Sequence, residues 1–223
     1  MIYYAVSSAA EFLGVPKFFS NSVGKLAKLQ KRLAKRKTKS RPWNIIKSKI
    51  SKLHQLISRQ HLDWQFKLAY QLFDDCQVIF LEDLEIKNLL RRCKAKCCDH
   101  GQFLPNGQLA KSGQNKSLQD AGFGQFIQVL EYIASKLGKR VIKVNPRGTS
   151  QHCWHCLNEV KKSLKDRWHS CNCGQELDRD YNSALPIKKI GLLSQQEEDI
   201  TSVKTALQHL SRGEESRVIL RSN

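Results

Sequence analysis

The stretch of sequence that decides the fold runs from Cys153-Trp154-His155-Cys156, through Cys171-Asn172-Cys173-Gly174, to Asp178-Arg179-Asp180-Tyr181-Asn182. It places four thiols in two close pairs, and zinc binds four thiolates in tetrahedral geometry. The second pair is one residue shorter than usual, and Gly174 directly after it suits a tight turn. A ribbon of this size cannot bury a core of its own, so the metal would supply its folding energy. We therefore predict a structural, closed zinc site formed by Cys153, Cys156, Cys171 and Cys173.

Other cysteine and histidine residues offer alternative ligands. Near the two pairs, three histidines could replace a cysteine: His152, His155 and His169. A separate group lies upstream, but its spacing fits no regular metal knuckle, and adjacent cysteines rarely both reach one ion. We interpret that group as an incidental loop rather than a second zinc site. It consists of Cys93, Cys97, Cys98 and His100.

The composition indicates a basic protein of one large domain, or of one domain with a small module. Thirty-eight Lys and Arg face 20 Asp and Glu, a formal net charge of +18, and polyanion binding is the commonest use of such an excess. No apolar run approaches the roughly 20 residues of a spanning helix, and no signal peptide is evident. We therefore expect a cytoplasmic protein without a membrane partner, in which the eight cysteines serve metal ligation rather than disulfides.

The positive charge is concentrated in one window. From Phe12 to Leu62 there is no acidic residue, and apolar residues recur at helical spacing. The pattern predicts two amphipathic helices, about 23–37 and 44–73, joined by a turn near Ser40-Arg41-Pro42. The alternative is a solvated charged face on a core hairpin, but so unbalanced a face repels itself unless a polyanion neutralises it. The predicted nucleic-acid-binding residues are Lys25, Lys28, Lys31, Arg32, Lys35, Arg36, Lys37, Lys39, Arg41, Lys47, Lys49 and Lys52.

Two acidic residues stand at the ends of predicted elements. The apolar run Val78-Ile79-Phe80-Leu81 indicates a buried strand that ends at Glu82, and Asp180 begins a helix just beyond the second cysteine pair. Carboxylates so placed can converge on Mg²⁺, and two such ions are a standard means of hydrolysing phosphodiesters. Spacing alone leaves open the alternative that Asp178 and Asp180 only cap a helix and that Glu82 faces solvent.

The remaining segments predict a mixed α/β sheet. Residues 1–20 are typical of strand, turn and strand, and residues 140–144 of another strand. Residues 93–118 are loop-like, and residues 120–137 form a helix that Ser117 or Asp120 could cap. A short helix follows Asp180 and ends at Gly191, before a polar tail.

Four segments, in this order, resemble the C-terminal part of the TnpB (OrfB-type) family. These are transposon-encoded, RNA-guided nucleases, related to type V CRISPR effectors and long described as transposases. The likeness covers roughly residues 11–191. The segments are Lys28-Leu29-Gln30-Lys31-Arg32-Leu33, then Val78 to Leu84, then Ser117 to Phe126, and the run from Val144-Asn145-Pro146 to Asp180-Tyr181-Asn182-Ser183-Ala184.

The resemblance implies an incomplete RuvC-like, RNase H-type mixed sheet with a long basic helical hairpin and an inserted four-cysteine zinc ribbon. It divides the chain into a truncated RuvC-like domain (1–145, hairpin at about 23–73), the zinc ribbon (146–178), the final acid and helix (179–191) and a polar tail (192–223). By position, Glu82 is the second catalytic acid and Asp180 the third. It further implies Mg²⁺-dependent cleavage of DNA guided by a bound RNA, with DNA and guide RNA as partners.

The departure from the family concerns its first catalytic Asp, which lies in a Gly-Ile-Asp-x-Gly strand. No such segment occurs here, and Glu11, Asp74 and Asp75 are poorly placed to substitute. We therefore expect a truncated nucleic-acid-binding member whose cleavage is impaired. Two alternatives stay open: a split nuclease completed by a separate N-terminal chain, and a non-enzymatic regulator that binds DNA or RNA.

Overall fold

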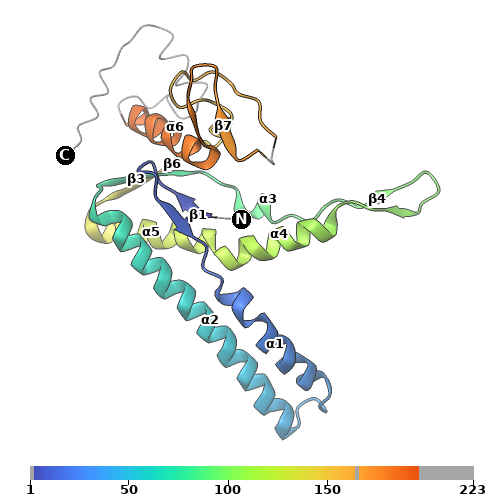
Figure 1. The fold of residues 1–223 in the computed structure, drawn as a ribbon. Helices are drawn as coiled ribbons and strands as arrows, with labels where there is room; N and C mark the ends of the chain where they lie inside the picture. The colour runs from blue at the N-terminus through green and yellow to red at the C-terminus, as the bar shows by residue number, and fades with distance from the viewer. Residues whose placement is uncertain (1–2, 164–165, 196–223) are drawn as a thin grey trace. The chain divides into compact units, whose positions relative to one another are not determined.

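A computed structural model describes residues 3–163 and 166–195 (Figure 1). Helices and short strands alternate, which confirms a mixed α/β protein. The chain forms two compact units. The first is built mainly from Gly14–Gln77 and Glu85–Arg140, and the second from Ala5–Leu13, Val78–Leu84 and the described residues from Val141 onward.

The elements are β1 (Tyr3–Val6), β2 (Phe12–Gly14), α1 (Phe18–Ala34), α2 (Arg41–Asp74), β3 (Val78–Glu82), α3 (Ile86–Leu89), β4 (Lys96–Cys97), β5 (Phe103–Leu104), α4 (Gln108–Ala121), α5 (Phe123–Leu137), β6 (Arg140–Val144), β7 (Trp168–Ser170), β8 (Glu176–Asp178) and α6 (Arg179–Ser194).

The predicted strands and the two predicted basic helices are present. In addition, β1 pairs with β2 and β3 pairs with β6. In the first unit, α1 and α2 run antiparallel side by side (Figure 1). Their apolar stripes face each other, because leucine and isoleucine at helical spacing are the buried positions. The core of this hairpin consists of Leu26, Leu53 and Ile57, with Phe18, Phe19, Leu29 and Ile50 packed around it.

The turn of the hairpin explains where α2 begins. Ser40 is its N-cap, and the Ser40 hydroxyl accepts a hydrogen bond from the backbone N–H of Trp43 at 3.4 Å. Pro42 lies in the first turn, where a missing N–H costs nothing. The first helix starts earlier than predicted, at Phe18, because a distant carboxylate satisfies its free N–H groups.

That carboxylate belongs to Asp120, at the end of α4. Its two oxygens accept the backbone N–H groups of Phe19 and Ser20, each at 3.0 Å, and the Ser20 hydroxyl at 2.6 Å. His61 Nε2 lies 3.2 Å from the same carboxylate. The expectation that Asp120 or Ser117 caps a helix over 120–137 was therefore wrong, because Asp120 caps α1 across the fold. The helix α5 starts instead at Phe123, after Gly122 in a left-handed conformation (φ 65°).

The helix α5 packs against the C-terminal half of α2, where the Phe66 and Tyr132 rings meet edge to face. Tyr4 is buried among three aromatic rings of the same unit, those of Trp64, Phe123 and Phe126. The side chain of Gln65 donates to the carbonyl of Gly122 at 3.1 Å and so holds the junction of α4 and α5 to α2. The other buried apolar side chains of these two helices are Leu68, Ala69 and Phe73 of α2 and Val129, Leu130, Ile133 and Ala134 of α5.

Residues 93–118 are more ordered than the loop we expected. They contain the antiparallel pair β4 and β5, with Lys96 opposite Leu104 and Cys97 opposite Phe103, and most of the helix α4. The cysteines and histidine of this segment belong to no group of three or more possible ligands in the described part of the chain.

In the second unit, α6 packs against β3. Val144, Ile190 and Leu193 form a small core, and Phe80 and Ile187 pack against it. The helix continues through Gly191 to Ser194, so the expected end at Gly191 was wrong. Gly191 is needed for space: a Cβ there would lie 2.1 Å from the Phe80 ring.

The sheets in the described residues are all two-stranded, and a single larger sheet is not seen there. The ribbon contains one such pair, β7 with β8, in which Trp168 lies opposite Asp178 and Ser170 opposite Glu176. Most of the predicted polar tail lies outside the described residues. In the described part of the chain, no helix combines the length and apolar character that crossing a membrane requires.

Candidate metal and nucleic-acid site

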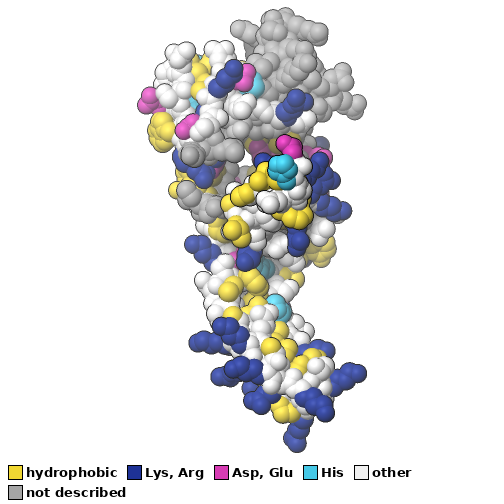
Figure 2. Space-filling view, turned by 90° about the vertical axis from the view of Figure 1, so that its right-hand side faces the viewer, with side chains coloured by type: hydrophobic (Ala, Val, Ile, Leu, Met, Phe, Trp, Pro, Cys, Tyr) yellow, Lys and Arg dark blue, Asp and Glu magenta, His cyan; other side chains and the backbone are white. Residues whose placement is uncertain are grey.

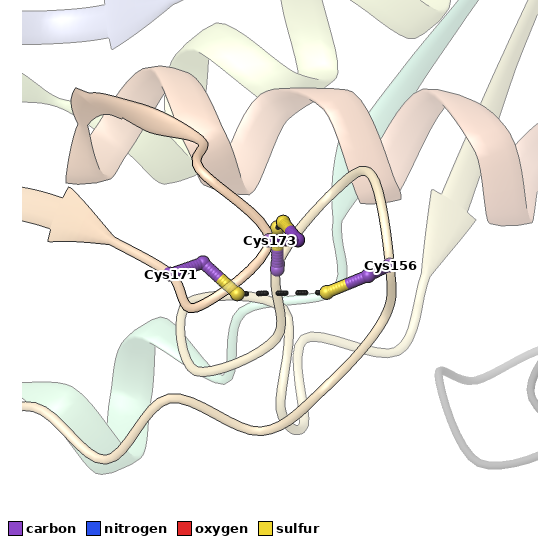
Figure 3. Close-up of side chains that lie close together, drawn as sticks. Cys156, Cys171 and Cys173 are labelled. Carbon is purple, nitrogen blue, oxygen red and sulfur yellow. Dashed lines mark hydrogen bonds between the residues drawn. The ribbon is translucent and has the colours of Figure 1, made fainter.

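Four cysteine sulfurs gather at one point of the ribbon. The Sγ atoms of Cys153, Cys156, Cys171 and Cys173 all lie within 4.8 Å of one another. Cys156 and Cys171 face each other with their sulfurs 3.5 Å apart (Figure 3), and those of Cys153 and Cys173 are 3.7 Å apart. Zinc–sulfur bonds of about 2.3 Å in a tetrahedron require sulfur–sulfur edges of about 3.8 Å. The donor set and its spacing therefore fit a zinc ion, and the predicted ligands are brought together.

The two knuckles form through similar backbone bonds. The N–H of Cys153 donates to the Asn158 carbonyl at 3.0 Å, and the N–H of Cys171 donates to the Gln175 carbonyl at 3.0 Å. Gly174 follows the second pair with φ 86°, a backbone conformation that glycine adopts without strain. The shortened second pair therefore still forms a tight turn, since glycine stands where the chain reverses.

The sulfurs affect one another's ionisation. The backbone N–H of Cys173 and the neighbouring sulfurs lower the pKa of Cys171 to about 7. The pKa of Cys173 is raised to about 12, because burial and the adjacent sulfurs outweigh the hydrogen bond from the Gln175 backbone. Four thiols this close cannot all release their protons unless a cation offsets the charge.

The three histidines considered as alternative ligands lie outside this group. His152 Nδ1 is 2.8 Å from the Gly148 carbonyl oxygen, and the His155 ring packs edge to face on Trp154. His169 is fully buried, and neither of its ring nitrogens has a hydrogen-bond partner in the described residues. Burial, followed by the charge of Lys162, lowers the pKa of His169, so the ring is favoured in its neutral form.

Glu82 ends β3, where the N–H of Asp83 donates to the Val144 carbonyl at 2.8 Å and closes the pairing with β6. The Glu82 side chain does not simply face solvent. It is half-buried, and Oε1 lies 2.9 Å from the hydroxyl of Thr149, which itself is 1% exposed. Burial raises the pKa of Glu82, the Thr149 hydrogen bond lowers it, and the charge of Asp180 raises it further. The charge of Asp180 therefore contributes, after burial, to the raised pKa of Glu82.

Asp178 and Asp180 have different surroundings. Asp178 caps α6: its carboxylate accepts the N–H groups of Asp180 at 2.8 Å and of Tyr181 at 3.2 Å. Asp180 lies inside the first turn, with its side chain 39% exposed. Its carboxylate lies 3.3 Å from the Arg179 guanidinium and 3.7 Å from that of Arg167. The capping alternative thus applies to Asp178 and not to Asp180.

Sequence reasoning did not assign a site role to two polar residues near these acids. Thr149 contacts Glu82, as described above. Asn182 is completely buried: its Nδ2 donates to the His152 carbonyl at 2.8 Å, and its Oδ1 accepts the N–H of Trp154 at 3.2 Å. No local pattern reveals such contacts, because the partners are 28 to 67 positions apart in the chain. The run Asp180-Tyr181-Asn182, an asparagine two residues after the acid, is the sequence feature that could have drawn attention to Asn182, although not to its contacts.

The hairpin of α1 and α2 carries the predicted basic residues on its surface. All twelve are exposed. Figure 2 shows Lys and Arg side chains gathered around the loop end of the hairpin, with hydrophobic side chains between them. An open hollow of about 700 Å³ lies at this end. It is lined by Lys39, Arg41, Asn44, Ile45, Ser48, Lys49 and Lys52.

Two family models match the chain. Residues 2–92 match the OrfB_IS605 model, "Probable transposase", and residues 123–187 match the "Cas12f1-like, TNB domain". The first match contains the basic hairpin and Glu82. The second contains α5, the four cysteines and Asp180. The two matches therefore fall on the same parts of the chain that the sequence motifs single out.

Similar proteins are found in bacteria and in a virus. The "Putative RNA-guided DNA endonuclease InsQ" of Escherichia coli (strain K12) is 30% identical over 145 residues, which are 65% of this chain and 35% of that protein. A "Putative RNA-guided DNA endonuclease" of Streptomyces pristinaespiralis is 27% identical over 187 residues, 83% of this chain and 42% of that protein. The "TnpB-like protein L79" of Acanthamoeba polyphaga mimivirus is 26% identical over 144 residues, 64% and 25% of the two chains.

The chain thus spans well under half of the length of these relatives. A partial likeness of fold, at 20% identity and a TM-score of 0.42, links 79% of this chain to 43% of a chain in the "Cryo-EM structure of the Cas12f1-sgRNA-target DNA complex". The two family-model matches and the curated relatives agree with the motif order along the sequence. The chain thus contains one region similar to the OrfB-type "Probable transposase" model and one similar to the Cas12f1-like TNB domain, and its relatives are TnpB-like proteins and proteins named as putative RNA-guided DNA endonucleases.

Proposed function

We propose that this chain binds nucleic acid through its basic hairpin and carries a RuvC-type, Mg²⁺-dependent nuclease site in an incomplete form, so that it cleaves DNA poorly unaided. The observation that carries the proposal is the place of Glu82, half-buried at the end of β3 with Oε1 2.9 Å from the Thr149 hydroxyl, where the charge of Asp180, almost a hundred residues later in sequence, contributes to its raised pKa. Such a pair suits Mg²⁺, which is commonly held by one or two carboxylates together with substrate phosphates. When bound there, the ion would stabilise the charge that develops on a phosphodiester.

Both carboxylates have surroundings that weaken metal binding. Burial favours the protonated form of Glu82. Asp180 lies beside the guanidinium groups of Arg167 and Arg179. In the described residues, no group of three or more possible ligands forms apart from the four cysteines. A pair of acids with these contacts supports weak ion binding and impaired cleavage.

The hairpin supports the binding half of the proposal. Its charge is uncompensated, since no acid lies between Phe12 and Leu62, and all twelve predicted residues are exposed. Phosphate backbones neutralise such a surface and release counterions, which makes the affinity strongly salt-dependent. By analogy with the relatives named as RNA-guided DNA endonucleases, we propose guide RNA and target DNA as the polyanions.

Binding is tested by fluorescence anisotropy with labelled RNA and DNA over a range of salt concentrations. Changing Lys39, Arg41, Lys49 and Lys52 to Gln should reduce the salt slope by about 0.7–0.9 for each phosphate contact removed. The matched control removes the same charge outside the hairpin, at Arg91, Arg92, Lys94 and Lys96. Equal slopes for the two variants would refute a specific role for the hairpin.

Cleavage is tested with Mg²⁺, labelled DNA, and the variants Glu82→Gln and Asp180→Asn. We expect little cutting by the chain alone. Robust cutting that both substitutions abolish would refute the impairment. Cutting that appears only after addition of a polypeptide with a third carboxylate would support the split nuclease. Unchanged nucleic-acid binding in both variants, together with a cellular phenotype, would support the regulator.

A further inference from the structure

One short segment touches both candidate acids and the cysteine site. It runs over residues 149–154, between β6 and the first knuckle, and we call it the linking segment. Its first residue, Thr149, contacts the Glu82 carboxylate at 2.9 Å. Near its other end lies the buried sulfur ligand Cys153. The segment therefore joins the predicted zinc site to the end of β3 by covalent chain and one hydrogen bond.

Asn182 joins the same segment to α6. Its amide bonds to the backbone on both sides of Cys153, donating to the His152 carbonyl and accepting from the Trp154 N–H. Asn182 follows Asp180 by two positions, so the two side chains point to nearly opposite sides of the helix. Asn182 can therefore anchor the helix by its buried side while Asp180 remains partly exposed beside Arg167.

The linking segment is itself held in one conformation. The chain turns at Gly148, which has φ 89°. The Gly148 carbonyl accepts hydrogen bonds from the N–H groups of Gln151 at 3.0 Å and His152 at 3.1 Å. Val160 N–H donates to the Gln151 carbonyl at 2.7 Å, and Cys153 N–H donates to Asn158. These last two bonds come from the ribbon, so the conformation of the segment depends on the ribbon being folded. The ribbon in turn is too small to fold without its metal.

We propose that the linking segment couples zinc binding at the four cysteines to the positions of Glu82 and Asp180, with Thr149 and Asn182 as the positioning residues. This inference rests on the proposed function, because it assumes that the two carboxylates bind a divalent ion. Removal of zinc loosens residues 149–154, and with them both contacts that fix the carboxylates. Groups that orient a metal ligand typically change metal affinity by about 10–100-fold when lost.

The test uses the full chain and Mn²⁺ as the probe, with free Mn²⁺ measured by electron paramagnetic resonance. Binding that Glu82→Gln and Asp180→Asn both weaken defines the carboxylate site. We expect Asn182→Ala and Thr149→Val to weaken Mn²⁺ binding about tenfold while zinc stays at one ion per chain. The matched controls are Ser183→Ala, which removes a bond local to α6 with the Arg179 carbonyl, and Ser150→Ala in the segment. Thr149→Ser should bind Mn²⁺ more tightly than Thr149→Val and close to the affinity of the unchanged chain, since it keeps the hydroxyl.

The decisive comparison is made with and without zinc. In the zinc-free Cys153→Ser chain, Mn²⁺ binding should already be weak, and adding Asn182→Ala should weaken it no further. Hydrogen exchange at the start of α6 should also be faster without zinc, a readout independent of any activity. If Asn182→Ala fails to fold, two other measurements test the coupling. One compares Mn²⁺ binding by Thr149→Val and Thr149→Ser, and the other follows Mn²⁺ binding while zinc is titrated into the chain of unchanged sequence.

Four results separate the possible failures. Equal Mn²⁺ affinity with and without zinc would overturn the coupling, as would equal effects of Asn182→Ala and Ser183→Ala. Additive losses from Cys153→Ser and Asn182→Ala would also overturn it, because they would show two independent effects. An affinity for Mn²⁺ that neither Glu82→Gln nor Asp180→Asn changes would instead refute the proposed divalent-ion site.

Discussion

The basic hairpin and the ribbon with its neighbouring acids depend on charged ligands in different ways. The hairpin is held by apolar contacts such as those of Leu26, Leu53 and Ile57, and its surface carries positive charge, since no acidic residue lies between Phe12 and Leu62 in the sequence. The ribbon is too small to bury a core of its own, and its folding centres on four thiols that require a cation. One region can therefore fold without a ligand but repels itself, whereas the other needs a ligand in order to fold. This difference predicts different responses to the same kinds of change.

The largest effect is expected from loss of one thiol. Structural zinc binding contributes on the order of 10–16 kcal/mol in small zinc domains, and most of this is folding free energy. We therefore expect Cys153→Ser to lose zinc and unfold the ribbon, while the far-ultraviolet helical signal of α1 and α2 is largely kept. Zinc content by mass spectrometry and circular dichroism measure the two responses.

The matched control is Cys97→Ser, which changes an exposed cysteine of β4 in the other unit. It should leave both zinc content and helical signal unchanged. Loss of the hairpin helices in Cys153→Ser would break the comparison, because it would show that the two regions do not fold independently.

A second, smaller effect comes from glycine positions in the two regions. In α6, a Cβ at Gly191 would lie 2.1 Å from Phe80, which packs against the core of the second unit. Forcing an extra methyl group into such packing costs about 1–3 kcal/mol, so Gly191→Ala should destabilise this unit. In α1, a Cβ at Gly24 meets nothing within 4 Å, and Gly24→Ala should stabilise the helix by about 1 kcal/mol.

Hydrogen exchange resolved by region measures both free energies in the same protein. Opposite signs in α6 and α1 are expected. If Gly191→Ala were neutral, the Phe80 ring could move aside, and the position of Glu82 two residues later would be less rigid than the contacts indicate.

The features predicted from the sequence are those whose cause is local. Helical spacing of Leu26, Leu53 and Ile57 predicted the hairpin, because periodicity and burial have the same physical origin. The spacing of the four cysteines predicted the cluster, because a knuckle is a short turn with two fixed ligands. Both features can be recognised without knowing where the rest of the chain lies.

The features missed depend on distant partners. Residues 108–121 are interrupted by glycine, serine and asparagine, which are weaker helix formers, yet they form α4, whose Asp120 binds the start of α1 about a hundred residues away. Gly191 sits inside a helix because Phe80 fills the space beside it. Thr149 and Asn182 acquire their roles only once β3, the linking segment and α6 are side by side. Tertiary contacts of this kind leave no periodic pattern in one sequence.

The smallest expected effect concerns Glu82. Unlike the exposed charges of the hairpin, its charge is half-buried and lowers the free energy of unfolding. Burial, together with the charge of Asp180, raises the pKa of Glu82, so the folded chain favours the protonated acid. Below the ordinary pKa of 4.5 both states are protonated and no penalty exists. As the pH rises from there through the raised folded value, the unfolded state loses its proton first, and the folded state loses stability. At neutral pH without divalent ions, Glu82→Gln should therefore stabilise the second unit.

Thermal unfolding of the variant and the unchanged sequence, at neutral pH and near pH 4, measures this difference. The gain from Glu82→Gln should shrink on acidification, because the unchanged chain then holds the proton itself. Asp83→Asn, at the adjacent exposed position, is the matched control and should shift stability by no more than about 0.5 kcal/mol at either pH. Added Mn²⁺ should reverse the order by stabilising the ionised Glu82, whereas a gain that persists unchanged in both conditions would mean that the penalty is not electrostatic. A buried acid that destabilises the fold until a cation arrives is the expected signature of a site kept for binding rather than for stability.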